Sequence, residues 1–374
     1  MADIFEILLR QLPQQPDHAL TAILGAILVV VLVAPFLSRK IEENLEPFFL
    51  LMGIIGVAVN WAYKVFDWEI IKELGYSAVK TPVILSGKPI GITEVVFLAG
   101  LIFLYYNRQI YRAIFSLIDR LGLPLFAFVM TFLLGSIASI ISVIVTAVIL
   151  AEIVAGLPIS KDGKVKFAVY SAFSVGLGAA LTPVGEPLST IAVSKLGVGF
   201  TYLIDLLGRD VFTGIAIASI ANALAMRRYA SQLQKGERRI EYAETLRGVI
   251  NRTIRVYIFV AALELLGGSL TPLAVWYFSK MGPHMLYWLN TISAVVDNAT
   301  LTAAEIYKGL TVFQQRSALL SLLISGGMLV PGNIPNIVMA GRLKINMKEW
   351  ARLGVPFGLG MLILFYILLF VVHF

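Results

Sequence analysis

Long apolar segments recur along the whole chain, and they constrain the fold more than any other feature. A helix needs roughly 20 apolar residues to cross the hydrocarbon core of a bilayer. Hydrophobic residues make up 58% of the 374 residues and charged residues only 14%, too few to cover a water-facing surface. We therefore predict an all-α polytopic protein, multi-pass in the cytoplasmic (inner) membrane. The candidate spans are 18–37, 46–66, 90–106, 206–226, 253–278 and 352–373.

Three further apolar stretches are too long or too interrupted for one straight helix. Residues 121–156 exceed a single crossing, and two stretches are broken by Thr182-Pro183-Val184-Gly185-Glu186-Pro187 and Pro331-Gly332-Asn333-Ile334-Pro335-Asn336. Proline removes a backbone donor and frees a carbonyl of the preceding turn. Non-helical backbone is tolerated at membrane depth only where protein buries it or where it lines a wet cavity. The broken stretches, 165–204 and 311–345, therefore indicate a functional site.

The distribution of basic residues predicts the orientation of the spans. A cytoplasmic location for 38–45, 107–120, 157–166, 227–255 and 341–352 places 20 of the 30 Lys and Arg on that side. This topology requires 121–156 to be a re-entrant hairpin entered from the cytoplasm, and 282–310 to be a second hairpin opened to the outside. The net charge of +7 is then an orientation signal, and we expect the lipid bilayer as partner and no nucleic acid.

The two halves of the chain are similar in register. Ala151-Glu152-Ile153-Val154-Ala155-Gly156-Leu157 matches Ala304-Glu305-Ile306-Tyr307-Lys308-Gly309-Leu310 at five of seven positions, and Pro183-x-x-x-Pro187 recurs as Pro331-x-x-x-Pro335. The topology orients the halves oppositely, so we predict inverted repeats, each with a re-entrant hairpin, a broken transmembrane helix and a final helix. The predicted organisation is N-terminal scaffold helices (1–120), a first repeat core (121–226), a basic cytoplasmic loop (227–252) and a second inverted repeat (253–374).

Three motifs carry a resemblance to a known family. The stretch 182–190 resembles the broken-helix motif of the ion transporter superfamily, above all that of NhaD-type sodium/proton antiporters. Asp297-Asn298-Ala299-Thr300 resembles its hairpin-tip motifs, and 332–336 resembles its second broken-helix motif. The resemblance covers residues 121–204 and 282–345. It implies an inverted-repeat antiporter, commonly a homodimer, whose transport domain moves against a scaffold; the shorter chain resembles a small branch.

Five carboxylates lie within or beside apolar segments, where an ionisable group costs roughly 2.5–3.5 kcal/mol on insertion scales. Asp297 lies where a hairpin should turn, and with the amide of Asn298 and the hydroxyl of Thr300 it offers oxygen ligands that hard cations prefer. An N-cap for the next helix is a compatible interpretation. Glu186, between two prolines, can hold either H⁺ or Na⁺, although the helix dipole alone also favours a glutamate there. The other three carboxylates are Glu152, Glu264 and Glu305.

Hydroxyl, amide and glycine positions near the breaks complete the predicted site. By the repeat register Asp297 corresponds to Ile144, so we expect the principal cation site in the second half. Serine and threonine in membrane helices also commonly bond to the preceding turn. Cation-binding candidates are Thr182, Ser189, Thr190, Asn333 and Asn336; lining candidates are Ser139, Ser142, Thr146, Gly185 and Gly332; gating or relay candidates are Glu152, Glu264 (a possible partner of Lys195) and Glu305.

These features predict a secondary active transporter that exchanges a monovalent cation for protons by alternating access, and we expect the cation to be Na⁺ held at Asp297 and Glu186. A sodium-coupled symporter of a small anion such as a carboxylate is the alternative, since half-helix N-termini favour anions; a channel is a third. We expect no enzyme, because only Asp297 is clearly embedded as an intramembrane aspartate and no Ser/His pair is evident. The chain has no cysteine and three separated histidines, so we expect no resident metal or cofactor.

Overall fold

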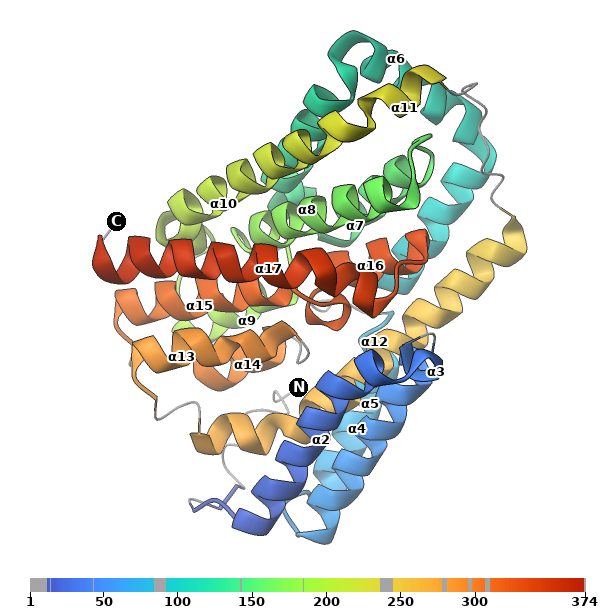
Figure 1. The fold of residues 1–374 in the computed structure, drawn as a ribbon. Coiled ribbons are helices and arrows are strands. Elements are labelled where there is room, and N and C mark those ends of the chain that lie inside the picture. Colours follow the sequence, from blue (N-terminus) through green and yellow to red (C-terminus); the bar gives the residue numbers. More distant parts are fainter. Residues whose placement is uncertain are drawn as a thin grey trace.

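The computed structural model describes residues 12–372 except 14, 43, 84–91, 142, 184, 236–244, 278–280, 295–297 and 307–309. Its regular elements in these ranges are helices, and none of the described residues is in a strand (Figure 1). In chain order they are α2 (His18–Leu37), α3 (Arg39–Glu42), α4 (Leu45–Ala62), α5 (Trp68–Lys80), α6 (Ile92–Ile141), α7 (Val143–Ala155), α8 (Lys161–Ala179), α9 (Pro187–Leu196), α10 (Tyr202–Met226), η1 (Arg227–Tyr229), α11 (Ala230–Lys235), α12 (Leu246–Tyr277), α13 (Pro283–Leu289), η3 (Asn290–Ala294), α14 (Asn298–Glu305), α15 (Val312–Gly326), η4 (Val330–Gly332), α16 (Ile334–Leu343), α17 (Met347–Tyr366) and the π-helical turn η5 (Ile367–Val371).

Five of the described helices are long and apolar enough to cross a membrane, as judged by length and composition. They confirm the prediction of an all-helical membrane protein. Four of them overlap the predicted spans 18–37, 46–66, 253–278 and 352–373. Of the other two predicted spans, residues 92–106 lie within α6 and 206–226 within α10, while residues 90 and 91 lie outside the described part of the chain. The five candidates are His18–Pro35, Leu45–Ala62, Ser116–Ile141, Leu246–Tyr277 and Met347–Val371.

Both predicted helix breaks are present. α8 ends at Ala179 and α9 begins at Pro187, so the first proline motif separates two helices. α15 ends at Gly326 and α16 begins at Ile334, with the short 3₁₀ turn η4 between them. In both places proline stands at the start of the second helix, where its missing N–H would have no intrahelical acceptor in any case.

The predicted hairpin segments are also each divided into two helices. α6 changes direction at Gly122, whose φ of 74° and ψ of 156° are non-helical, and its second arm (123–141) is followed by α7. In the second half, α13 and η3 precede α14. α7 packs against α6, and α14 packs against η3. The lining candidate Ser142 and most of the turn before α14 lie outside the described residues.

One group of helices consists of α2, α4, α5 and α12 (Figure 1, lower right). α12 was expected to open the second repeat, but it packs chiefly along α4 and also along α5. The buried Asn60 side chain joins α4 to α12, because its Nδ2 donates to the carbonyls of Gly56 (2.7 Å) and Ser269 (2.8 Å). Such interhelical amide bonds stabilise helix pairs where water is absent.

The remaining long helices form a second group, in which the pairings are reciprocal. α7 packs against α16, and α14 packs against α9. α8 packs against α17, and α10 packs against α15. The four helices α7 to α10 therefore each contact one of the four helices α14 to α17. In both sets the first helix contacts the third of the other set, and the second contacts the fourth.

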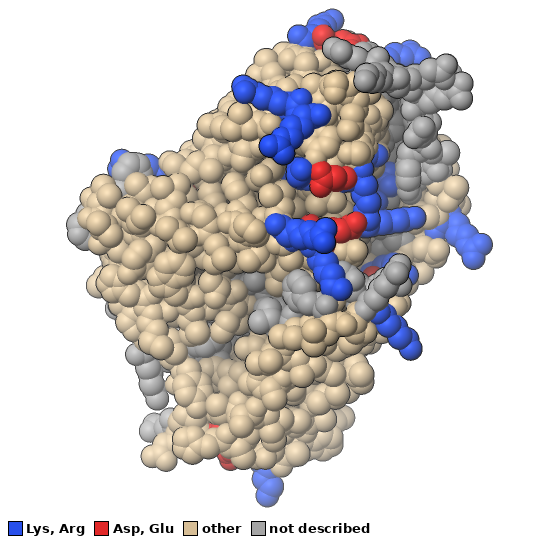
Figure 2. Space-filling model, viewed as in Figure 1, with Lys and Arg blue, Asp and Glu red and all other residues tan. Residues whose placement is uncertain are grey.

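Lys and Arg side chains gather along one edge of the molecule, near α3, α11 and α16, whereas most of the visible face is uncharged (Figure 2). This edge includes an exposed ion pair in which Lys161 Nζ lies 2.6 Å from Glu349 Oε1. The distribution is that of a helical bundle whose sides face lipid and whose charged ends face water.

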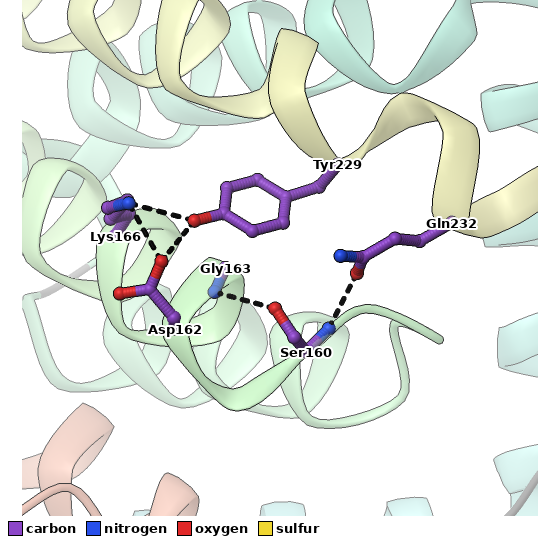
Figure 3. Close-up of polar contacts among 6 residues, drawn as sticks. All are labelled: Ser160, Asp162, Gly163, Lys166, Tyr229 and Gln232. Carbon is purple, nitrogen blue, oxygen red and sulfur yellow. Dashed lines mark hydrogen bonds and ion pairs between the residues drawn. The ribbon is translucent and has the colours of Figure 1, made fainter.

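The start of the basic loop is anchored to the N-terminus of α8 (Figure 3). Tyr229 donates a hydrogen bond to Asp162, Lys166 Nζ lies 2.7 Å from Asp162 Oδ2 and 2.8 Å from the Tyr229 hydroxyl, and Gln232 Oε1 accepts from the N–H of Ser160 at 2.9 Å. The hydrogen bonds from Lys166 and Tyr229 lower the pKa of Asp162, and those with Asp162 and Tyr229 raise the pKa of Lys166. We call these residues the α8 anchor.

Candidate functional site

The first helix break is bound to the end of α6 and the start of α7. Thr182 donates its hydroxyl to the carbonyl of Ser139 at 2.6 Å, and the N–H of Val143 donates to the carbonyl of Gly185 at 3.0 Å. A Cβ on Gly185 would collide with the carbonyl of Ala179. The bare backbone at Gly185 therefore lets the break, the hairpin and the end of α8 approach one another closely.

The hydroxyl groups after the first break bond to backbone carbonyls. Thr190 Oγ1 donates to the carbonyl of Pro183 at 2.6 Å, and Ser189 Oγ donates to the carbonyl of Glu186 at 2.9 Å. These are the structural contacts anticipated as the alternative to ion ligation. The Glu186 side chain itself is buried, with 2% of its surface exposed.

The second helix break is closed by two asparagines. Asn336 Nδ2 donates to the carbonyls of Gly326 and Leu329, each at 2.7 Å, so it satisfies the last turn of α15. Asn333 is the N-cap of α16, because its Oδ1 accepts from the N–H of Ile334 at 2.8 Å. Both side chains are buried. The positive end of the α16 dipole therefore begins inside the protein.

Close approaches at two glycines show that the start of α14, the second break and the end of α8 lie close together. A Cβ built on Gly326 would lie 2.9 Å from the carbonyl oxygen of Gly332 and 3.5 Å from Nδ2 of Asn298. A Cβ built on Gly176, near the end of α8, would lie 2.6 Å from Nδ2 of Asn333. The first residue of α14 and the second break are thus neighbours, next to the part of α8 that meets the first break.

Several polar atoms of the second half are buried without a hydrogen-bond partner among the described residues. Buried polar groups normally have one, so a cluster of exceptions marks a candidate site. Oxygen predominates in it: the only nitrogen is Nδ2 of Asn298. The atoms are Oδ1 of Asn290, Nδ2 of Asn298, both carboxylate oxygens of Glu305, Oγ of Ser325 and Oδ1 of Asn336.

Some predicted ligands cannot be placed. Asp297 and Ser142 lie outside the described residues, as does the side chain of Thr300. Asn298 follows Asp297 directly and is buried at the start of α14. Thr146 on α7 is fully buried. Of the predicted set, the structure therefore brings Asn298, Gly332, Asn333 and Asn336 together, and it joins Thr182 and Gly185 to the first hairpin.

The gating candidates differ in their surroundings. Glu152 on α7 forms a bidentate ion pair with Arg342 on α16, with Nε–Oε1 and Nη2–Oε2 distances of 2.6 Å, and both side chains are buried. Sequence reasoning missed Arg342, because it was counted among the basic residues that orient the chain. Glu264 on α12 accepts a hydrogen bond from Ser77 on α5 at 2.6 Å.

Glu305 on α14 is as deeply buried as Glu152, with 1% of its surface exposed. The polar side chain beside it is that of Asn290. Nδ2 of Asn290 already donates to Ser321 Oγ at 2.8 Å and to the carbonyl of Ala318 at 3.3 Å, so no well-formed hydrogen bond reaches either oxygen of Glu305.

The described residues contain no group of three or more His, Asp or Glu side chains that could hold a metal ion. No curated protein matches the sequence. A family model described as "Protein of unknown function (DUF1646)" matches residues 21–372, which is nearly the whole chain. The chain therefore belongs to the DUF1646 family.

Proposed function

We propose that this protein is a secondary active transporter of the cytoplasmic membrane that exchanges Na⁺ or a similar monovalent cation for protons by alternating access. The motifs at 182–190, 297–300 and 332–336, which resemble those of NhaD-type antiporters, suggest this chemistry. On the same resemblance the protein acts as a homodimer. The edge rich in Lys and Arg is the cytoplasmic side by the positive-inside rule (Figure 2).

The reciprocal packing supports inverted repeats. α7 and α14 carry the matching Ala-Glu-Ile motifs, and each packs against the half-helix that follows the proline break of the other half, α16 and α9 respectively. Two copies of one unit related by a pseudo-two-fold axis produce such exchanged contacts. Transporters of this architecture bind their substrate between the repeats, at the discontinuous helices.

The observation that carries the proposal is the cluster of buried, unpartnered oxygens at the second break and its hairpin. Five of the six unpartnered atoms in residues 290–336 are amide, hydroxyl or carboxylate oxygens. Hard cations take oxygen ligands, and protons bind carboxylates. A site of this composition can hold either guest, and competition between them is sufficient for antiport.

One observation favours the alternative, sodium-coupled transport of a small carboxylate. Nδ2 of Asn298 is a buried donor without a partner, close to the N-terminus of α16, and both features suit an anion. The buried carboxylates Glu186 and Glu305 would repel it. We therefore propose cation exchange, and the experiment below also tests binding of a small carboxylate.

The test uses the purified chain in proteoliposomes with a trapped pH-sensitive dye. Addition of NaCl or LiCl against an imposed proton gradient should move protons, whereas choline chloride should not. In detergent, Na⁺ should raise the apparent unfolding temperature, since a ligand at 100 times its Kd adds about 2.7 kcal/mol to the free energy of unfolding. No cation-dependent proton movement, together with stabilisation by succinate only when Na⁺ is present, would replace the antiporter with the symporter.

A further inference from the structure

The two glutamates that correspond in the repeat have opposite electrostatic surroundings. Glu152 and Glu305 occupy the same position of the Ala-Glu-Ile motif, on α7 and α14. Glu152 is neutralised by the bidentate contact with Arg342. Glu305 is equally buried, yet neither of its oxygens has a hydrogen-bond partner among the described residues.

The sequence accounts for the difference. Arg342 stands seven residues after Pro335 in α16, and the residue seven positions after Pro187 in α9 is Ser194. α14 packs against α9 just as α7 packs against α16. The position of α9 that corresponds to Arg342 is therefore uncharged, and the nearest basic residue in that half-helix is Lys195, one position later. An uncompensated charge in the interior is costly, so such a carboxylate is stable there only with a proton or a cation.

A line of polar groups connects Glu305 with the second break. Glu305 lies beside Asn290, and Asn290 donates to Ser321 on α15. Ser325 follows Ser321 by four residues, so both lie on one face of α15, one turn apart. Ser325 directly precedes Gly326, where Asn298 and Asn336 meet. Asn290 on η3 and the two serines on α15 therefore connect Glu305 with the unpartnered oxygens at the break.

Charged groups on the elements around α14 do not neutralise Glu305. These elements are α9, α12, α15 and η3, and η3 carries no titratable residue. Arg316 on α15 is bound to Asp210, with Nε–Oδ2 at 2.6 Å, and Glu264 on α12 accepts from Ser77. The other titratable residues on these helices are Lys195 on α9 and Arg247, Arg252, Arg255, Tyr257 and Tyr277 on α12; of these, none whose side chain is described hydrogen-bonds to Glu305.

We propose that Glu305 carries the exchanged proton, and that the Asn290–Ser321–Ser325 line couples it to a cation bound at the second break. This assignment rests on the proposed antiport. When the cation enters, the O–H bond of the Glu305 carboxyl breaks, the proton passes to water, and the carboxylate charge is balanced by the cation. The reverse step restores the O–H bond as the cation leaves. Glu152, held by Arg342, takes no part in the proton exchange.

Infrared difference spectroscopy tests the assignment without relying on transport. Adding NaCl instead of choline chloride to the purified protein should remove the C=O stretching band of a protonated carboxylic acid. Glu305→Gln should abolish this difference band, and the paired control Glu152→Gln/Arg342→Gln should retain it. A band that persists in Glu305→Gln, or that is absent from the wild-type protein, would overturn the proposal.

Proteoliposomes supply the second measurement. In Glu305→Gln, Na⁺-driven proton movement should fall to the level of protein-free liposomes. If this variant still exchanges unlabelled for labelled Na⁺, the rate of that exchange should not depend on pH. Glu305→Asp, which keeps the carboxylate, should retain coupling with a displaced pH profile. If the wild-type protein exchanges Na⁺ for protons and Glu305→Gln does so with the same pH profile, only the assignment of Glu305 fails. If the wild-type protein moves no protons in any cation gradient, the proposed function itself fails, and the infrared result then decides Glu305 separately.

Discussion

Arg342 holds both carboxylate oxygens of Glu152, each at 2.6 Å, across 190 residues of sequence. The pair joins α7 to α16, the helix after the second break. Because both side chains are buried, the two charges are sheltered from water and stabilise each other directly.

Removing one member of this pair should strongly destabilise the protein. We expect Arg342→Leu to lower the free energy of unfolding by about 3–5 kcal/mol, because it strands the Glu152 carboxylate. The double variant Glu152→Leu/Arg342→Leu should recover most of the loss. Lys161→Ala, which breaks the exposed pair with Glu349, is the control and should cost at most about 1 kcal/mol. Equal effects of the two single variants in detergent unfolding would contradict this account.

Gly178 should tolerate no side chain. A Cβ there would collide with the carbonyl of Gly135, so α6 and α8 would have to separate. Overpacking of this kind costs about 1–3 kcal/mol, and we expect Gly178→Ala to lower the unfolding temperature accordingly. Gly25→Ala is the matched control, since nothing lies within 4 Å of its would-be Cβ. Better helix propensity should leave that variant unchanged or slightly more stable.

Substitutions of the two asparagines near Gly326, Asn336 and Asn298, should have different effects on stability and on Na⁺ binding. Asn336→Ala loses two hydrogen bonds to carbonyls, so it should destabilise the apoprotein by about 1–3 kcal/mol. Asn298→Ala removes a buried donor that has no partner among the described residues, so the apoprotein should be as stable as the wild-type protein or more so. Thermal unfolding with and without Na⁺ measures both quantities. Asn298→Ala should lose the stabilisation by Na⁺, and retention of the full Na⁺ effect would exclude Asn298 from the site.

The α8 anchor should be insensitive to pH in the physiological range. The pKa of Asp162 is lowered from its ordinary 3.8, so its stabilising contribution is present above that value and is lost only as pH falls further. The pKa of Lys166 is raised from 10.5, so its contribution is present below that value and is lost only at higher pH. Hydrogen exchange of α11 should therefore be protected equally at pH 6 and pH 9, after correction for the intrinsic rate. Asp162→Asn should accelerate it at both, and a pH-dependent opening in the wild-type protein would show that another group controls this contact.

The helix breaks could be predicted, because proline acts through local backbone geometry. Pro187 and Pro335 stand at the starts of α9 and α16 and allow those helices to begin there. The amphipathic α5 carried a usable signal as well, since Ile70, Leu74 and Ala78 recur at helical spacing and are buried. With 13 residues, α5 is too short to cross the membrane, so a search for membrane spans does not detect it.

The partners of the polar residues could not be predicted, because they depend on tertiary packing. Arg342 belongs to a cluster of basic residues at a helix end, and nothing in its neighbours distinguishes it from Lys344 or Lys348. Its contact with Glu152 exists only because α16 packs on α7. The difference between Glu152 and Glu305, which share one motif, is for the same reason invisible until the opposing half-helices are compared.

Gly122 joins two arms of α6 that point in different directions (Figure 1). The first arm has about 30 residues and a length of about 45 Å at 1.5 Å per residue. Such an arm acts as a lever: a rotation of about 10° at one glycine would displace its far end by about 8 Å. The positive φ at this position makes any other residue costly there, so the angle between the two arms depends on a glycine at this one backbone position.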